Sequence, residues 1–175
     1  MLFRSNLSLS TLTELAARLG SDIPFFLTGG AAVMAGRGER ITPLDWSPPG
    51  YVLLILPAFG ISTASVYKAL RPEDMHPDER GVWATAPRTV DELDAGCFND
   101  LEAAARRVSP ALTELQGQLK NFGIGRVHLS GSGSAMFSLF EDGDRAVWAA
   151  DRLGNGPGIR TCVVDYIGRR PQALS

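Results

Sequence analysis

The chain has 175 residues, of which 45% are hydrophobic and 21% are charged, and its formal net charge at pH 7 is -2. These values are typical of an ordinary globular protein with one domain, or one and a fraction. The balance of charge argues against nucleic acid or an anionic membrane as a partner. There is no signal peptide and no apolar run of transmembrane length, and the two cysteines lie far apart. We therefore expect no disulfide framework, no zinc site and no other metal site of protein ligands alone, and a cytoplasmic location.

A helix and a β-hairpin are the first predicted elements. Thr11-Leu-Thr-Glu14 has the spacing of a capping box, apolar residues follow at helical spacing, and Gly20 is the expected C-cap. Ala31–Ala35 and Arg40–Leu44 are expected to pair around the turn Gly36-Arg-Gly-Glu39.

Asp22 lies between this helix and the hairpin, two residues before Pro24. A short acid on a stiff turn beside apolar residues is well placed to act as a proton acceptor. An aspartate here could equally cap a short helix that begins at Ile23-Pro24. Residue types alone leave both roles open.

After a proline- and glycine-rich linker, strands and helices alternate. The predicted strands are Tyr51–Leu56, Arg126–Leu129, Ala135–Phe140 and Arg160–Ile167. Helices are predicted from Ser62 or Thr63 to about Leu70, after Thr89, near Asn99-Asp100, from Ser109 to Asn121 and from Asp144 to Leu153, with an irregular loop over Arg71–Pro87. The first strand is a continuous apolar run, so we expect it to be buried on both faces. The order predicts the split β-α-β of a ferredoxin-like α/β sandwich with extra helices in its first crossover.

The loop Ser130-Gly-Ser-Gly-Ser134 is the second stretch that could carry chemistry. Gly131 and Gly133 would let the backbone approach a ligand closely, while Ser130, Ser132 and Ser134 add hydroxyl groups beside a nest of turn amides. An ordinary β-turn between two core strands explains the same residues. The loop has neither the P-loop pattern nor the spacing of a dinucleotide fingerprint. Of the two histidines, His76 is expected to be solvated and His128 to point away from the core.

Five segments, in order along the chain, resemble the GHMP kinase superfamily. They are Leu15-Ala-Ala-Arg-Leu-Gly-Ser-Asp-Ile-Pro-Phe-Phe26, Gly36-Arg-Gly-Glu39, Phe59-Gly-Ile-Ser-Thr63, Phe98-Asn-Asp-Leu-Glu102 and Ser130-Gly-Ser-Gly-Ser134. More narrowly, they resemble the 4-diphosphocytidyl-2-C-methyl-D-erythritol kinase family of non-mevalonate isoprenoid (terpenoid) biosynthesis. The resemblance implies an α/β (α+β) fold, with a remnant of the N-terminal domain at 1–46 and a ferredoxin-like C-terminal domain at 47–175.

The resemblance also implies a reaction and a set of site residues. The reaction is ATP-dependent phosphorylation of a hydroxyl of the cytidine-diphosphate substrate, with ATP and Mg²⁺ as cofactors. Asp22 matches the aspartate that accepts the hydroxyl proton, and Ser130–Ser134 matches the glycine loop beside the phosphates. Thr63 and Tyr67 fall where the family contacts cytosine, and a flat tyrosine ring suits stacking on a base. The spacing of Val66, Tyr67 and Leu70 also fits the core stripe of one helix.

The family pattern is only partly present. Family members carry an upstream lysine and a glycine- and serine-rich ATP loop that this sequence lacks, so we expect a truncated kinase. An apolar patch that leads to self-association is then expected at Leu12, Leu15, Phe25, Phe26 and Val33. Two other functions remain open: a non-catalytic small-ligand-binding paralogue, and another GHMP kinase of the homoserine or mevalonate type.

Overall fold

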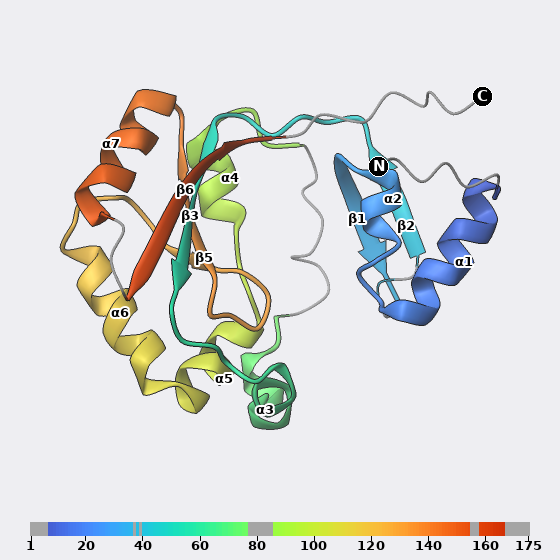
Figure 1. Ribbon diagram of the computed structural model, residues 1–175, viewed down its shortest axis with the longest axis horizontal. Coiled ribbons are helices and arrows are strands. Elements are labelled where there is room, and N and C mark those ends of the chain that lie inside the picture. The colour runs from blue at the N-terminus through green and yellow to red at the C-terminus, as the bar shows by residue number, and fades with distance from the viewer. Residues whose placement is uncertain (1–6, 37, 39, 77–85, 155–157, 167–175) are drawn as a thin grey trace. The chain divides into compact units, whose positions relative to one another are not determined.

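The structure is a computed structural model that describes residues 7–36, 38, 40–76, 86–154 and 158–166. The chain divides into two compact units, Met1–Ser47 with Tyr166–Ser175, and Pro48–Asp165 (Figure 1). Arg37 and Glu39 of the predicted turn and residues 77–85 of the predicted irregular loop lie outside the described residues. Within the described ranges, no helix is long and apolar enough to cross a membrane. The assignment of the two stretches to GHMP kinase domains stays a prediction.

The first unit contains the predicted helix and hairpin. Its elements are α1 (Leu9–Leu19), α2 (Phe25–Thr28), β1 (Ala31–Ala35) and β2 (Arg40–Leu44). The two strands pair antiparallel, with Ala31 opposite Leu44 and Ala35 opposite Arg40. Gly20 is the C-cap of α1, as predicted.

The start of α1 differs from the prediction. The N-cap is Ser8, whose hydroxyl accepts a hydrogen bond from the Thr11 amide at 3.2 Å. The capping box at Thr11 was therefore the wrong choice, because Ser8 offers the same hydroxyl chemistry three residues earlier. The extra turn brings Leu9 into the helix.

The second unit is a four-stranded antiparallel sheet with helices. Its elements are β3 (Tyr51–Pro57), α3 (Thr63–Ala69), the 3₁₀ turn η1 (Pro72–Asp74), α4 (Val90–Gly96), α5 (Leu101–Val108), α6 (Pro110–Lys120), β4 (His128–Leu129), β5 (Met136–Phe140), α7 (Gly143–Leu153) and β6 (Ile159–Asp165). The strand order in the sheet is β4-β5-β3-β6. This order confirms the predicted ferredoxin-like arrangement, with the extra helices between β3 and β4.

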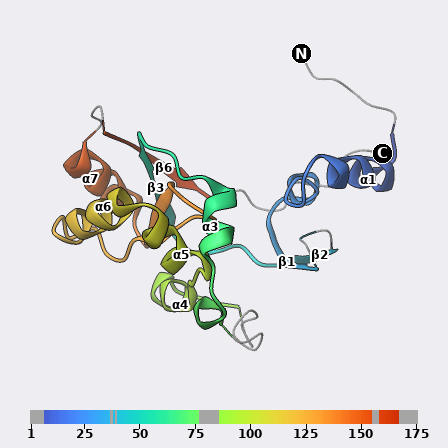
Figure 2. The ribbon, with the colours of Figure 1, turned by 90° about the horizontal axis from the view of Figure 1, so that it is seen from below.

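The hydrophobic core lies on one face of this sheet. Leu53 and Ile55 of β3 are 0% exposed, and they cluster with Leu129, Met136 and residues of α3, α5, α6 and α7. Figures 1 and 2 show these four helices beside the sheet. The strand residues that alternate with Leu53 and Ile55, which are Val52 and Leu54, are only half-buried. Burial of β3 on both faces was therefore a wrong prediction, since successive strand residues alternate and these four helices all pack on the face that holds Leu53 and Ile55.

The strand β4 is shorter than predicted. The expected strand Arg126–Leu129 is reduced to two residues, which pair with Phe137 and Met136. Ser138 is buried in β5, and its hydroxyl donates to the Arg126 carbonyl at 2.7 Å. The Ser138 side chain thus binds the Arg126 carbonyl, which would accept a main-chain hydrogen bond if β4 were longer.

Candidate functional site

The helix α3 meets the serine-glycine loop within the second unit. Of the two predicted caps, Ser62 and Thr63, it is Ser62 that caps α3, because its hydroxyl accepts from the Ser65 amide at 3.3 Å. Thr63 then lies in the first turn, and its hydroxyl is 2.8 Å from that of Ser132. One turn later, Tyr67 is 59% exposed while its neighbour Val66 is fully buried. The core-stripe interpretation of Tyr67 is therefore wrong, and the ring is accessible to a ligand.

Glycine is required in the loop itself. Gly131 and Gly133 have φ angles of 54° and 83°, in the left-handed region that favours glycine. A Cβ at Gly133 would lie 3.0 Å from Leu129 Cδ1 and 3.2 Å from Ile61 Cδ1. The Gly133 amide donates to the Ser130 carbonyl at 2.9 Å and closes the turn. Among the described residues, the amides of Gly131 and Ser132 donate no backbone hydrogen bond, so they are available to an anion.

Two side chains, one at the end of the loop and one outside it, fix the position of the loop. Ser134 donates its hydroxyl hydrogen to the Phe59 carbonyl. Asn99 uses its amide nitrogen to bind two loop carbonyls, Leu129 O and Gly131 O, each at 2.8 Å. Its amide oxygen accepts from the Leu101 amide at 3.0 Å at the start of α5. We assigned Asn99 no role from the sequence, and its place in Phe98-Asn-Asp-Leu-Glu102 was the only signal.

A pocket of about 270 Å³ adjoins the loop. The residues that line it are Cys97, Phe98, Asn99, Glu102, His128, Leu129, Ser130, Gly131 and Phe137. His128 lies on the sheet face opposite to the buried Leu129, as expected, and its Nε2 is 2.6 Å from Asp94 Oδ1. Burial and the charge of Asp94 raise the pKa of the Cys97 thiol. The thiol is therefore protonated at neutral pH and is a poor nucleophile.

Asp22 belongs to the first unit, where it is exposed in the turn before α2. The N-cap of α2 is Pro24 and the helix has no side-chain cap, so a capping role for Asp22 is wrong. Within the described residues, its carboxylate makes no hydrogen bond or ion pair. The proton-acceptor role stays a prediction.

No group of three or more histidine, cysteine or acidic side chains that could hold a metal ion occurs among the described residues. Proteins usually hold Mg²⁺ by one or two carboxylates together with substrate phosphates. The predicted Mg²⁺ therefore stays a proposal.

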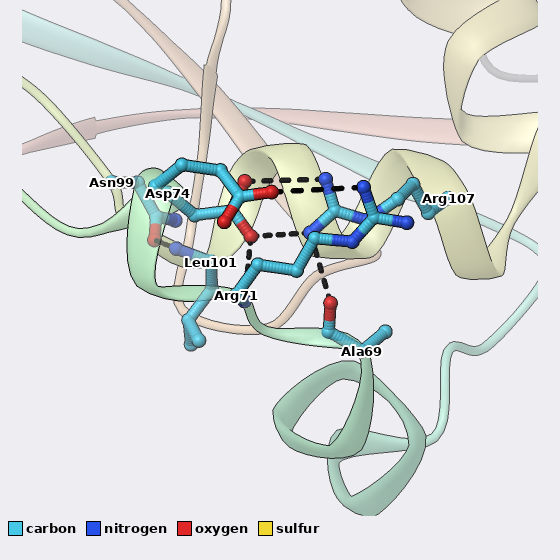
Figure 3. Close-up of polar contacts among 7 residues, drawn as sticks. Ala69, Arg71, Asp74, Asn99, Leu101 and Arg107 are labelled. Carbon is cyan, nitrogen blue, oxygen red and sulfur yellow. Dashed lines mark hydrogen bonds and ion pairs between the residues drawn. The ribbon is translucent and has the colours of Figure 1, made fainter.

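A polar cluster joins the chain after α3 to α5 (Figure 3). The Asp74 carboxylate, 6% exposed, binds both terminal nitrogens of Arg107 and accepts from the Arg71 amide at 2.8 Å. Arg107 also donates to the Ala69 carbonyl at 2.9 Å. His76 is solvated, as predicted, but it also has a partner. Its main-chain amide and its ring nitrogen Nδ1 both bind the Asp100 carboxylate.

This cluster predicts a pH dependence of stability. The hydrogen bond from Arg107 holds the pKa of Asp74 below its ordinary value, against the opposing effect of burial. A carboxylate with a lowered pKa in the folded state stabilises fully above its unfolded pKa, and the contribution is lost as the pH falls through the folded pKa. We expect the Tm difference between wild type and Asp74→Asn to be constant from about pH 7 to about pH 5 and to shrink below about pH 4. A difference that stays constant down to about pH 3 would contradict the assignment.

The comparisons with known proteins agree with the fold. Residues 84–157 match the family model for the C-terminal domain of GHMP kinases. A 4-diphosphocytidyl-2-C-methyl-D-erythritol kinase from Geobacillus sp. is 38% identical over 159 residues, which are 89% of this chain and 53% of the relative. The enzyme of the same name from Thermus thermophilus is 41% identical over 142 residues, 81% of this chain and 51% of the relative.

Two solved structures are similar over most of the chain. A crystal structure of 4-(cytidine 5'-diphospho)-2C-methyl-D-erythritol kinase has a TM-score of 0.71 and 36% identity, and the match covers 92% of this chain and 57% of that one. A homoserine kinase from Cytophaga hutchinsonii has a TM-score of 0.60 at 14% identity, over 94% of this chain and 59% of that one. The second likeness concerns the fold alone.

These matches confirm the resemblance to the GHMP kinases found in the sequence. Within that class, the relatives and the first solved structure named above are 4-diphosphocytidyl-2-C-methyl-D-erythritol kinases. The chain spans about half the length of the curated relatives it matches.

Proposed function

We propose that this chain carries the substrate side of a kinase that transfers a phosphoryl group from ATP to a hydroxyl of 4-diphosphocytidyl-2-C-methyl-D-erythritol, in the cytoplasm. The observation that carries the proposal is the 2.8 Å contact between Thr63 and Ser132. Inside one unit, it joins a helix with an exposed tyrosine to a loop in which, among the described residues, the Gly131 and Ser132 amides donate no backbone hydrogen bond. A cytidine diphosphate has a flat base at one end and anionic phosphates at the other, which matches these two surfaces.

Each candidate residue has a distinct task in this proposal. Tyr67 stacks on the cytosine and Thr63 contacts it, while Ser130–Ser134 surround phosphate oxygens with amides and hydroxyls. Asp22 accepts the proton of the attacking hydroxyl. ATP, when bound, would supply the phosphoryl group, and Mg²⁺ would neutralise charge on its phosphates. Phosphoryl transfer has a loose transition state, so the protein acts mainly by positioning groups and balancing charge.

The other functions considered have less support. Similarity to the homoserine kinase concerns the fold alone, whereas two relatives near 40% identity carry the methylerythritol name. A non-catalytic paralogue would bind the cytidine ligand without transferring phosphate, so binding and transfer must be measured separately.

The cytosine assignment predicts that Tyr67→Ala weakens the binding of cytidine diphosphate by about tenfold to a hundredfold. Stacking of a base on an aromatic ring contributes about 1–3 kcal/mol, which corresponds to this range. Isothermal titration calorimetry on the 175-residue chain measures it. Tyr67→Phe keeps the ring and Lys68→Ala alters the exposed neighbour, so both should bind as wild type does.

The calorimetry separates two ways in which this assignment could fail. Unchanged affinity in Tyr67→Ala would remove Tyr67 from the site. Absence of binding by the wild-type chain would count against the proposed function as a whole.

A further inference from the structure

We propose that two residues at the ends of α5, Asn99 and Arg107, are positioning residues that hold the glycine loop and α3 in register for a cytidine-diphosphate ligand. The inference rests on the proposed function, which it deepens by naming what aligns the two halves of the binding surface. Neither side chain belongs to the set expected to touch the ligand.

Asn99 holds the loop from the N-terminal end of α5. Its two N–H groups reach Leu129 O and Gly131 O, the carbonyls on either side of Ser130. Its oxygen is committed to the Leu101 amide, which fixes the side chain to the helix start. All the hydrogen-bonding groups of the amide except one oxygen lone pair are thus used. The curvature of the loop is therefore tied to α5.

Arg107 holds α3 from the C-terminal end of α5. It donates to Ala69 O, the carbonyl of the last residue of α3, at 2.9 Å (Figure 3). The last carbonyls of a helix lack partners within the helix, and a cation there is favourable. Since α3 has only seven residues, it depends on contacts of this kind to stay helical.

Asp74 sets the orientation of the Arg107 guanidinium, which binds the end of α3. Its carboxylate accepts hydrogen bonds from both terminal nitrogens of Arg107 and from the Arg71 amide. The guanidinium plane is therefore fixed between η1 and the end of α3. An arginine that binds a carboxylate through two nitrogens has a defined orientation that a lysine cannot reproduce. The position of the Tyr67 ring, half a turn before Ala69, follows from that orientation.

The helix between these two residues is a rigid spacer. Ala104 and Ala105 of α5 are fully buried in the core of the second unit. A movement of α5 would therefore disturb the core, whereas Asn99 and Arg107 connect its ends to the less buried loop and α3.

The neighbouring arginine provides a matched control. Arg106 lies in the same turn, but it binds Gln116 at 2.7 Å and Glu102 at 2.6 Å, and among the described residues it makes no hydrogen bond to α3 or to the loop. Replacing either arginine removes one positive charge from the same turn. Only the replacement of Arg107 releases the end of α3.

The test measures the Kd of cytidine diphosphate by calorimetry and the Tm of each variant. Arg107→Ala should weaken binding by roughly fivefold to tenfold, as expected for lost positioning hydrogen bonds, and Arg106→Ala by less than about twofold. Arg107→Lys should recover only part of the loss. Asn99→Asp keeps the acceptor for Leu101 but loses both donors, so it should weaken binding similarly. Equal effects of the two arginine replacements, or a lower Tm of Arg107→Ala with unchanged Kd, would overturn the inference.

Hydrogen exchange separates failure of this inference from failure of the proposed function. The rate of amide hydrogen exchange should rise over residues 63–74 in Arg107→Ala and over residues 129–135 in Asn99→Asp. In Arg106→Ala it should rise in neither segment. If the wild-type chain binds no cytidine diphosphate, the proposed function fails and the exchange pattern still decides whether the two side chains hold these segments. Unchanged exchange in both variants would overturn the inference by itself.

Discussion

Replacing Asp22 with asparagine is expected to lower the kcat of phosphoryl transfer by about 10²–10⁴-fold, the usual contribution of a general base. Asparagine has nearly the same shape but cannot accept the proton of the attacking hydroxyl. The measurement is transfer from Mg·ATP to 4-diphosphocytidyl-2-C-methyl-D-erythritol by the 175-residue chain. Asp45→Asn is the matched control, because Asp45 is also an exposed aspartate of the first unit.

Each outcome of this assay decides something. Turnover that Asp22→Asn abolishes and Asp45→Asn leaves intact would support the proton-acceptor role and would mean that this chain supplies its own ATP site. Turnover that Asp22→Asn leaves unchanged would contradict that role. No turnover by wild type, with binding of cytidine diphosphate retained, would limit the chain to the substrate half of the site.

Gly50→Ala is expected to lower the free energy of unfolding by about 2–5 kcal/mol. Gly50 has a φ of 82°, which costs a residue with a Cβ about 1–2 kcal/mol. The added Cβ would also lie 2.2 Å from the Phe140 carbonyl oxygen and 2.5 Å from Val90 Cγ2. Moving a strand and a helix to make room typically costs about a further 1–3 kcal/mol.

Gly60→Ala is the control for this prediction. A Cβ at Gly60 meets nothing within 4 Å, and this glycine does not have a positive φ. Urea denaturation should therefore show a lower midpoint for Gly50→Ala only. Equal stability of the two variants would contradict the steric argument.

Elements encoded by nearby residues were predicted well from the sequence. Ser62 or Thr63, and Thr89, were expected to cap helices, and the hydroxyls of Ser62 and Thr89 each accept from the amide three residues later. The strand order also followed from the alternation of apolar segments and breakers. The start of α1 was missed because Ser8 and Thr11 have the same capping chemistry, and local sequence does not choose between them.

Features that depend on distant residues could not be predicted. His76 binds Asp100, and Ser138 takes the carbonyl of Arg126, but nothing near these residues in the sequence indicates the pairing. The roles of Asn99 and Arg107 depend on carbonyls about thirty or more residues away. For the candidate site, the resemblance indicated Thr63 and Tyr67, yet helical spacing alone could not show that Tyr67 points outward. Only the folded helix decides that Val66, and not Tyr67, enters the core.

The strand order has a consequence for synthesis on the ribosome. β3 is the first strand of its sheet to be made, but Ile55 pairs with Met136 on one side and Thr161 on the other. Both partners emerge only when most of the chain has been translated. Closing such long loops costs conformational entropy before the strand pairing stabilises the sheet, so topologies of this kind fold slowly. The apolar run 51–56 must therefore stay exposed during elongation, when it is a natural substrate for chaperones that bind extended hydrophobic segments.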